Sequence, residues 1–131
     1  EPLVHPQLQQ FIAYASQKGL NVTIGSNGSY FTADRVKKLI DNGLTKVKGD
    51  FCFDKVQYES LRKGGIWEDV LDGYRNLLKY AISKKRNFQL ILVDLNSYQL
   101  EKADAENSLK NLKELFTYPE KYFLIRFIKT T

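Results

Sequence analysis

Residues 88–95, Phe-Gln-Leu-Ile-Leu-Val-Asp-Leu, form the most strongly patterned stretch of the chain. The centre of this stretch, Leu90–Val93, is apolar at every position, so neither face of the segment is suited to water. Short apolar runs of this kind are typical of a central strand in a parallel sheet, which is buried on both faces. The stretch therefore predicts a parallel α/β protein in which helices cover both sides of this strand.

Strand and helix patterns alternate along the rest of the chain. Strands are predicted over Leu20–Ile24, Leu44–Val47 and Tyr122–Ile128, in addition to Phe88–Leu95. Helices are predicted over Pro6–Lys18, from Thr32 to Gly43, over Lys55–Arg62 and Trp67–Ala81, and around Leu109, Leu112 and Leu115. Repeated strand-then-helix units predict a parallel sheet with right-handed crossovers. The sheet is expected to be either an open doubly wound sheet or an arc of a barrel.

Length, composition and charge limit the classes of function. The 131 residues, 43% of them hydrophobic, suit one folded domain spanning residues 1–131. The net charge is +5, but the basic residues are spread over helix faces, so we expect no nucleic-acid partner. The scattered lysines include Lys37, Lys38, Lys79, Lys84 and Lys85. With no apolar stretch of membrane-spanning length and no signal-peptide pattern, we expect a cytoplasmic protein without membrane contact.

Polar loops follow two of the expected strands. The turn Ser26-Asn27-Gly28-Ser29 comes after one strand, and Asp94 lies at the end of the strongest strand. In parallel α/β proteins, ligands bind at the carboxyl ends of strands. We therefore expect Asn27 and Asp94 to face the same site. Asp94 is equally expected to bond the amides of its own turn.

Several motifs, in order along the chain, resemble the core of the radical S-adenosylmethionine (SAM) enzymes. They are Glu1-Pro2-Leu3, His5-Pro6-Gln7-Leu8, Ser26-Asn27-Gly28, Asp54-Lys55 with Tyr58-Glu59, and Arg62-Lys63-Gly64-Gly65. Their spacing fits that family over most of the chain, and the likeness weakens after about Asp94. The resemblance implies an arc of a partial (β/α) TIM-like barrel, of which this chain would be a fragment.

The resemblance also implies an activity and its cofactors. In that family, a Cys-x3-Cys-x2-Cys loop holds a 4Fe-4S cluster, which chelates SAM and cleaves it reductively to start radical chemistry. This chain has one cysteine and lacks that loop, so we expect the metal ligands and the reactive centre to lie outside it.

The same resemblance assigns roles to residues that contact the cofactor. Glu1 would meet the SAM amino group, while Ser26, Asn27 and Gly28 would line the SAM cavity. Within Lys48–Phe53, where the family usually has a Ser-Leu-Asp-Gly-like segment, Asp50 is the expected polar contact.

Two functional hypotheses remain open at this point. One is a segment of a radical SAM enzyme acting on a small-molecule or peptide substrate, with the N-terminal part of the barrel or a partner chain covering the sheet edge. The other is a non-catalytic, cluster-free α/β module that binds a ligand or protein. The single cysteine, Cys52, cannot form an internal disulfide and is expected to be structural.

Overall fold

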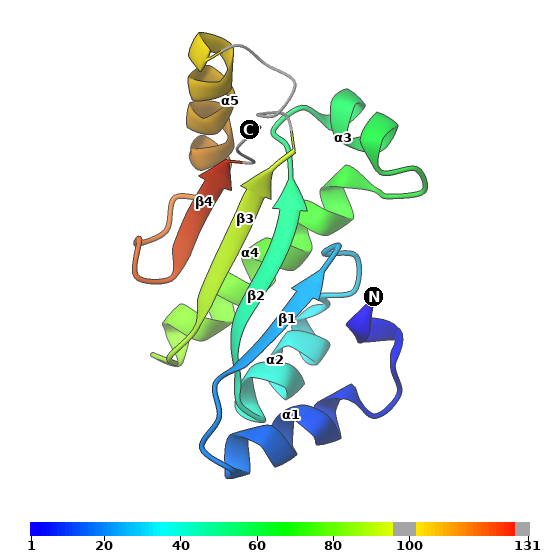
Figure 1. Cartoon of the computed structure of the whole chain (residues 1–131), viewed down its shortest axis with the longest axis vertical. Coiled ribbons are helices and arrows are strands. Elements are labelled where there is room, and N and C mark those ends of the chain that lie inside the picture. The colour runs from blue at the N-terminus through cyan, green and yellow to red at the C-terminus, as the bar shows by residue number, and fades with distance from the viewer. Residues whose placement is uncertain (96–101, 128–131) are drawn as a thin grey trace.

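The computed structural model describes residues 1–95 and 102–127 of the chain as a four-stranded, all-parallel sheet with helices (Figure 1). The strands are β1 (Val22–Ser26), β2 (Leu44–Phe51), β3 (Gln89–Asp94) and β4 (Phe123–Phe127). The helices are the 3-10 turn η1 (Pro2–Val4), α1 (Leu8–Gln17), α2 (Ala33–Asp41), α3 (Lys55–Leu61), α4 (Trp67–Ser83) and α5 (Lys102–Leu115). None of the helices in these two ranges is both long enough and apolar enough to cross a membrane.

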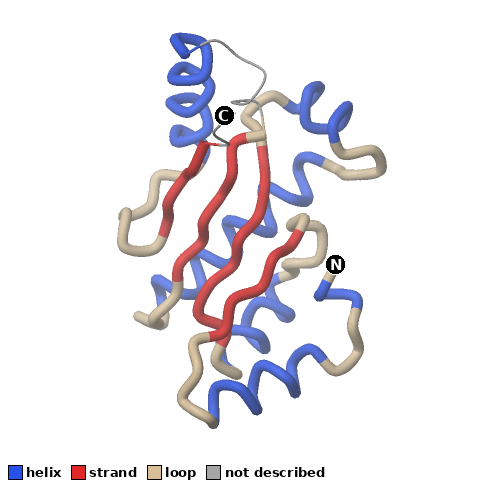
Figure 2. Tube along the Cα trace, viewed as in Figure 1, coloured by secondary structure: helices blue, strands red, loops and turns tan. Residues whose placement is uncertain are grey.

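The strand order decides between the two expected sheet types. The strands lie side by side as β1-β2-β3-β4, so every crossover moves in the same direction (Figure 2). Right-handed crossovers that all move one way place their helices on one face of the sheet. A doubly wound sheet would instead reverse direction at an inner strand. The chain is therefore α/β with an arc-like parallel sheet, as in part of a barrel.

The helices pack on one face of the sheet in the described residues, so the prediction of helices on both sides of β3 is wrong. Figure 1 shows α2 and α4 behind the sheet. Asp94, Leu92 and Leu90 are every second residue of β3, so their side chains point to the same face of the sheet. Ser108 of α5 donates a hydrogen bond to Asp94, which places α5 in the same helix layer. In a sheet wound in one direction, the second face of a central strand lines the inside of the arc, which explains why β3 is apolar without a second helix layer.

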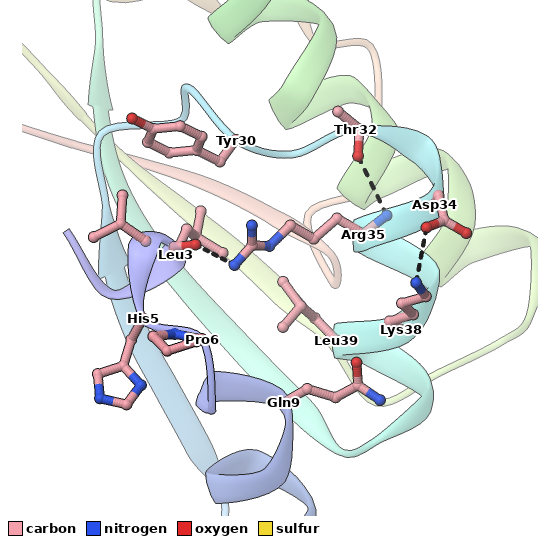
Figure 3. A pocket seen from close by; sticks show the side chains of 11 residues that line it. Leu3, His5, Pro6, Gln9, Tyr30, Thr32, Asp34, Arg35, Lys38 and Leu39 are labelled. Carbon is pink, nitrogen blue, oxygen red and sulfur yellow. Dashed lines mark hydrogen bonds and ion pairs between the residues drawn. The ribbon is translucent and has the colours of Figure 1, made fainter.

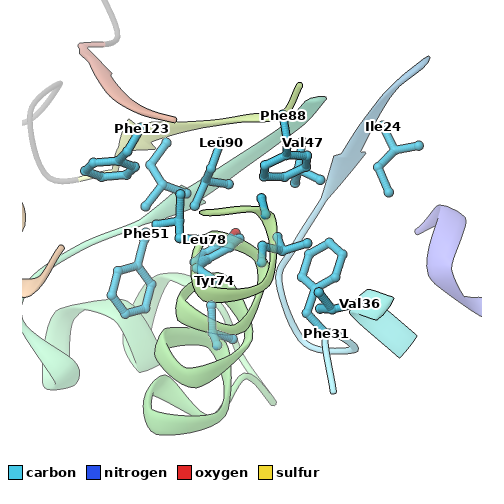
Figure 4. Packing of buried hydrophobic residues seen from close by; sticks show 14 of the residues in the cluster. Ile24, Phe31, Val36, Val47, Phe51, Tyr74, Leu78, Phe88, Leu90 and Phe123 are labelled. Carbon is cyan, nitrogen blue, oxygen red and sulfur yellow. The ribbon is translucent and has the colours of Figure 1, made fainter. Parts of the chain in front are cut away.

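A single buried cluster joins the strands to this helix layer. Val47 and Leu90 of β2 and β3 face Tyr74 and Leu78 of α4, and Ile24 of β1 lies on the side of Phe31 and Val36 (Figure 4). Every second residue of each strand points toward this cluster, because successive side chains point to opposite sides of a strand. The opposite face carries a row of aligned residues from neighbouring strands. This row is Gly25, Lys48, Ile91 and Leu124.

Two features of the helix layer position the loops above it. β2 runs to Phe51, beyond the predicted end at Val47, because Gly49 leaves room for the ring of Tyr74. The Tyr74 hydroxyl donates to the carbonyl of Asp50 at 3.0 Å and holds the end of β2 against α4. In α4, a Cβ atom on Gly73 would lie 2.8 Å from the Gly28 carbonyl oxygen, so the β1–α2 loop touches the helix backbone directly.

Candidate functional site

A groove of about 620 Å³ opens at the carboxyl ends of β1, β2 and β3, and we call it the strand-end groove. This is where parallel α/β folds bind ligands. Four of the residues predicted from the sequence as site residues line it, namely Glu1, Ser26, Asn27 and Asp50. Its other lining residues are Pro2, Gly25, Lys48, Gly49, Arg62, Val93 and Leu95.

Glu1 fastens the N-terminal turn to the β1–α2 loop. Its Oε1 accepts a hydrogen bond from the Leu3 amide at 3.1 Å, and its Oε2 accepts one from the Asn27 amide at 2.8 Å. Each carboxylate oxygen can accept more than one hydrogen bond, so the carboxylate retains acceptor capacity toward the groove.

The Ser26–Ser29 turn is held by its own side chains. The Gly28 amide donates to Ser26 Oγ, and the Ser29 amide donates to Asn27 Oδ1, both at 3.0 Å. Such short-range bonds are the reason why serine and asparagine favour turns. The Ser26 hydroxyl keeps its own proton as a donor for a ligand in the groove.

Gly28 lies behind the groove, not in its lining. Its φ of +85° is a conformation that residues with a side chain rarely adopt. A Cβ atom there would lie 2.7 Å from Tyr74 Cζ and 2.7 Å from Val70 Cγ1 of α4. Gly28 therefore allows the loop to pack closely on α4 and supports the groove wall from behind.

Asp50 and Arg62 form the central ion pair of the groove. Arg62 Nε donates to Asp50 Oδ1 at 3.2 Å, and Arg62 Nη2 makes a second, parallel contact with Asp50 Oδ2. Paired contacts of this kind fix the orientation of both groups. With Glu1 and Lys48, the groove lining holds two acidic and two basic side chains, a balance that suits a zwitterionic ligand. Arg62 was part of a family-like motif, but the sequence did not place it beside Asp50.

Asp94 faces the helix layer. It is fully buried, and its Oδ2 accepts a hydrogen bond from Ser108 Oγ at 2.9 Å. This bond joins the end of β3 to α5, an arrangement that neither sequence expectation for Asp94 included. A ligand contact by Asp94 stays a prediction.

The chain's own residues do not fit an iron-sulfur cluster. Cys52 is fully buried, its Sγ lies 3.1 Å from the Asp54 carbonyl oxygen that accepts its hydrogen bond, and burial raises the pKa of the thiol to about 12. It is therefore a neutral thiol at neutral pH, whereas cluster ligands are thiolates. Within residues 1–95 and 102–127, no group of three or more His, Cys, Asp or Glu side chains could hold a metal ion.

No family model and no curated protein matches this chain. The site is therefore interpreted from its own geometry.

A pocket of about 520 Å³ lies away from the strand ends, between the N-terminal segment and α2 (Figure 3). Its charged groups already have partners. Arg35 Nη2 donates to the Leu3 carbonyl, and Lys38 pairs with Asp34 at 3.1 Å. His5 Nδ1 accepts a hydrogen bond from the Gln7 amide at 3.1 Å, just before α1 begins. The contact between Arg35 and Leu3 fixes the position of η1, and Glu1, which caps η1, is thereby placed in the strand-end groove.

We expect Cys52 to react slowly with a thiol reagent in the folded protein at neutral pH and rapidly after unfolding in urea. The folded-state pKa of about 12 lies above the ordinary value of 9.0, so the unfolded chain loses this proton first as pH rises. The protonated Cys52 thiol therefore contributes fully to the free energy of unfolding below about pH 9, and this contribution declines as pH rises toward 12. Urea unfolding of Cys52→Ala across this pH range should show a shallower decline. Rapid labelling of the folded protein would contradict the burial of this thiol.

Proposed function

We propose that this chain forms the SAM-binding segment of a radical SAM enzyme. One observation carries the proposal: the strand-end groove gathers Glu1, Ser26, Asn27 and Asp50, which come from three separate segments of the sequence. These are residues to which the family resemblance assigns contacts with SAM. The consecutive parallel arc, with its groove at the strand ends, supports the same interpretation.

The residues of the groove suit the chemical groups of SAM. The Glu1 carboxylate would bind the ammonium group, and Asp50 would accept hydrogen bonds from ribose hydroxyls. Lys48 and Arg62 would supply cations for the SAM carboxylate. The groove volume, about 620 Å³, is in the usual range of small-molecule sites.

The cluster ligands and the cover for the sheet edge would come from outside this chain. β1 ends the sheet in the described residues, and nearby α1 leaves Phe11 55% exposed and Tyr14 64% exposed. An unpaired strand edge beside apolar side chains favours a further strand and helix. We propose that the N-terminal part of the barrel or a partner chain covers this edge, and that the assembled enzyme is cytoplasmic with a small-molecule or peptide substrate.

The second candidate function is a non-catalytic ligand- or protein-binding module. It is favoured by the contacts that the acidic residues of the groove already make. Asp50 is paired with Arg62, and Glu1 accepts hydrogen bonds from two backbone amides, so both acidic side chains of the groove have partners without a ligand.

The deciding experiment uses the full-length parent protein, reconstituted anaerobically with iron and sulfide. We expect cluster absorbance, SAM binding and, after addition of a one-electron reductant such as dithionite, formation of 5′-deoxyadenosine. Asp50→Asn should weaken SAM binding by about tenfold, because a charge-assisted hydrogen bond is lost. The matched control is Asp69→Asn, which changes an exposed carboxylate in the first turn of α4.

Two outcomes would contradict the enzyme proposal. One is a reading frame that lacks Cys-x3-Cys-x2-Cys upstream of Glu1. The other is a folded, full-length protein that shows no cluster absorbance after reconstitution. Either result would leave the binding module as the better explanation of the groove.

A further inference from the structure

A second hollow of about 410 Å³ adjoins the strand-end groove, and we call it the α3 hollow. Asn27 and Arg62 line both spaces and form the wall between them. The β1–α2 loop contributes Ser29 and Tyr30 to the α3 hollow, while α3 and the loop after it contribute Leu61 and Lys63. The two spaces therefore share Asn27 and Arg62, and their other lining residues differ.

The charged side chains that line the α3 hollow are all basic. Its charged lining residues are Arg62 and Lys63, and every residue that lines it is described by the structure. The pocket of Figure 3 differs because its lining includes an acidic residue, Asp34, which pairs with Lys38 inside the pocket. A hollow with two cations and no acidic side chain in its lining favours an anion.

The pairing with Asp50 orients Arg62 for a second partner. A guanidinium group has five N–H donors, and Asp50 engages Nε and Nη2. The two donors on Nη1 are not used by this pair. Asp50 thus holds the side chain in place from the strand-end groove while leaving donors for the α3 hollow.

Apolar groups complete the lining. Tyr30 is 42% exposed and Leu61 is 38% exposed, so both present apolar surface that a ligand could cover. Ser29 adds a hydroxyl that can donate to an anion. Small-molecule sites commonly combine apolar walls with a few polar groups that fix orientation.

We propose that the α3 hollow binds a small organic anion, with its carboxylate or phosphate group on Arg62 and Lys63 and its apolar part against Tyr30 and Leu61. This site requires neither SAM nor a cluster, because its anion would bind donors and apolar walls of a different space. The site is a second ligand position beside the strand-end groove.

The test is a titration of the isotope-labelled 131-residue chain, followed by NMR at the amides of Ser29, Gly64 and Gly65 and at Arg62 Nε. The probes are phenyl phosphate, benzoate, inorganic phosphate and benzyl alcohol. We expect saturable shifts with phenyl phosphate and, more weakly, with benzoate. Inorganic phosphate should bind less tightly than phenyl phosphate because it lacks the apolar part, and neutral benzyl alcohol should cause no saturable shift.

Lys63→Gln provides the specific variant, because this exposed side chain can lose its charge without disturbing the core. We expect phenyl phosphate to bind roughly fivefold more weakly, in line with the loss of one charge-assisted contact at a partly exposed site. Lys84→Gln, which removes an exposed charge at the end of α4, should leave binding unchanged.

The proposal is overturned if neither aromatic anion produces saturable shifts at these positions, or if Lys63→Gln binds as the unchanged protein does. Equal binding of inorganic phosphate and phenyl phosphate would refute the apolar contact with Tyr30 and Leu61. Binding by phenyl phosphate alone would identify phosphate as the preferred group, and comparable binding by benzoate would identify carboxylates as ligands too. Failure here would leave SAM binding by the parent protein untouched, because that experiment probes the strand-end groove.

Discussion

Phe51→Ala is expected to lower the free energy of unfolding by about 3–5 kcal/mol, the usual range for removing a buried aromatic ring from a core. Phe51 is fully buried at the end of β2. Its ring centroid lies 5.2 Å from that of Tyr58, 5.6 Å from that of Trp67 and 5.9 Å from that of Tyr74. The substitution would leave a cavity among three aromatic rings that come from two helices. Urea unfolding followed by fluorescence measures the loss, since the chain has one tryptophan.

The matched control is Phe11→Ala, which removes the same side chain from an exposed position on α1. It should change the free energy of unfolding by less than about 1 kcal/mol. Phe51→Leu keeps much of the apolar volume and should fall between the two, so the series can be read even if Phe51→Ala does not fold. Equal losses for Phe11→Ala and Phe51→Ala would show that the aromatic cluster is not the centre of the core.

Gly28→Ala is expected to lower the free energy of unfolding by about 2–5 kcal/mol. About 1–2 kcal/mol of this arises because alanine disfavours the positive φ of +85°. A further 1–3 kcal/mol, roughly, arises because the new Cβ would lie 2.7 Å from Tyr74 and Val70, which overpacks the contact with α4. Chemical unfolding measures the sum.

Gly19→Ala separates these two contributions. Gly19 also has a positive φ, +77°, but no atom lies within 4 Å of the position its Cβ would take. Its substitution should cost about 1–2 kcal/mol, from the backbone alone. If Gly28→Ala is no more damaging than Gly19→Ala, the β1–α2 loop does not pack on α4 as closely as described.

The alternation of strands and helices could be predicted from the sequence because each element carries its own periodic signal. The apolar run in β3 and the one-sided pattern of α4 are local properties of the chain. The last four residues of β2, by contrast, were not predicted as strand. Lysine, glycine and aspartate disfavour strands, and Gly49 is used because Tyr74, far along the chain, needs the space.

The site was predicted in part, for a similar reason. Strand-end position pointed to the Ser26–Ser29 turn and to Asp94, and the family resemblance pointed to Asp50. The turn and Asp50 meet at the groove because the carboxyl ends of parallel strands share one edge, whereas Asp94 faces the helix layer. Pairing across the groove has no local signal, so Arg62 was not placed beside Asp50. The apolar pattern of β3 likewise did not distinguish a second helix layer from the inner face of an arc.

The contact between Gly28 and Gly73 has a consequence for motion. The β1–α2 loop that makes this contact also buries Phe31 beside Gly73 and accepts a hydrogen bond from Asn76 of α4, so it cannot open as a lid without exposing that ring and losing these contacts. The Asn27 wall of the groove should therefore move only together with α4. Ligand binding at the strand ends would then slow amide hydrogen exchange along this helix, far from any atom that the ligand touches.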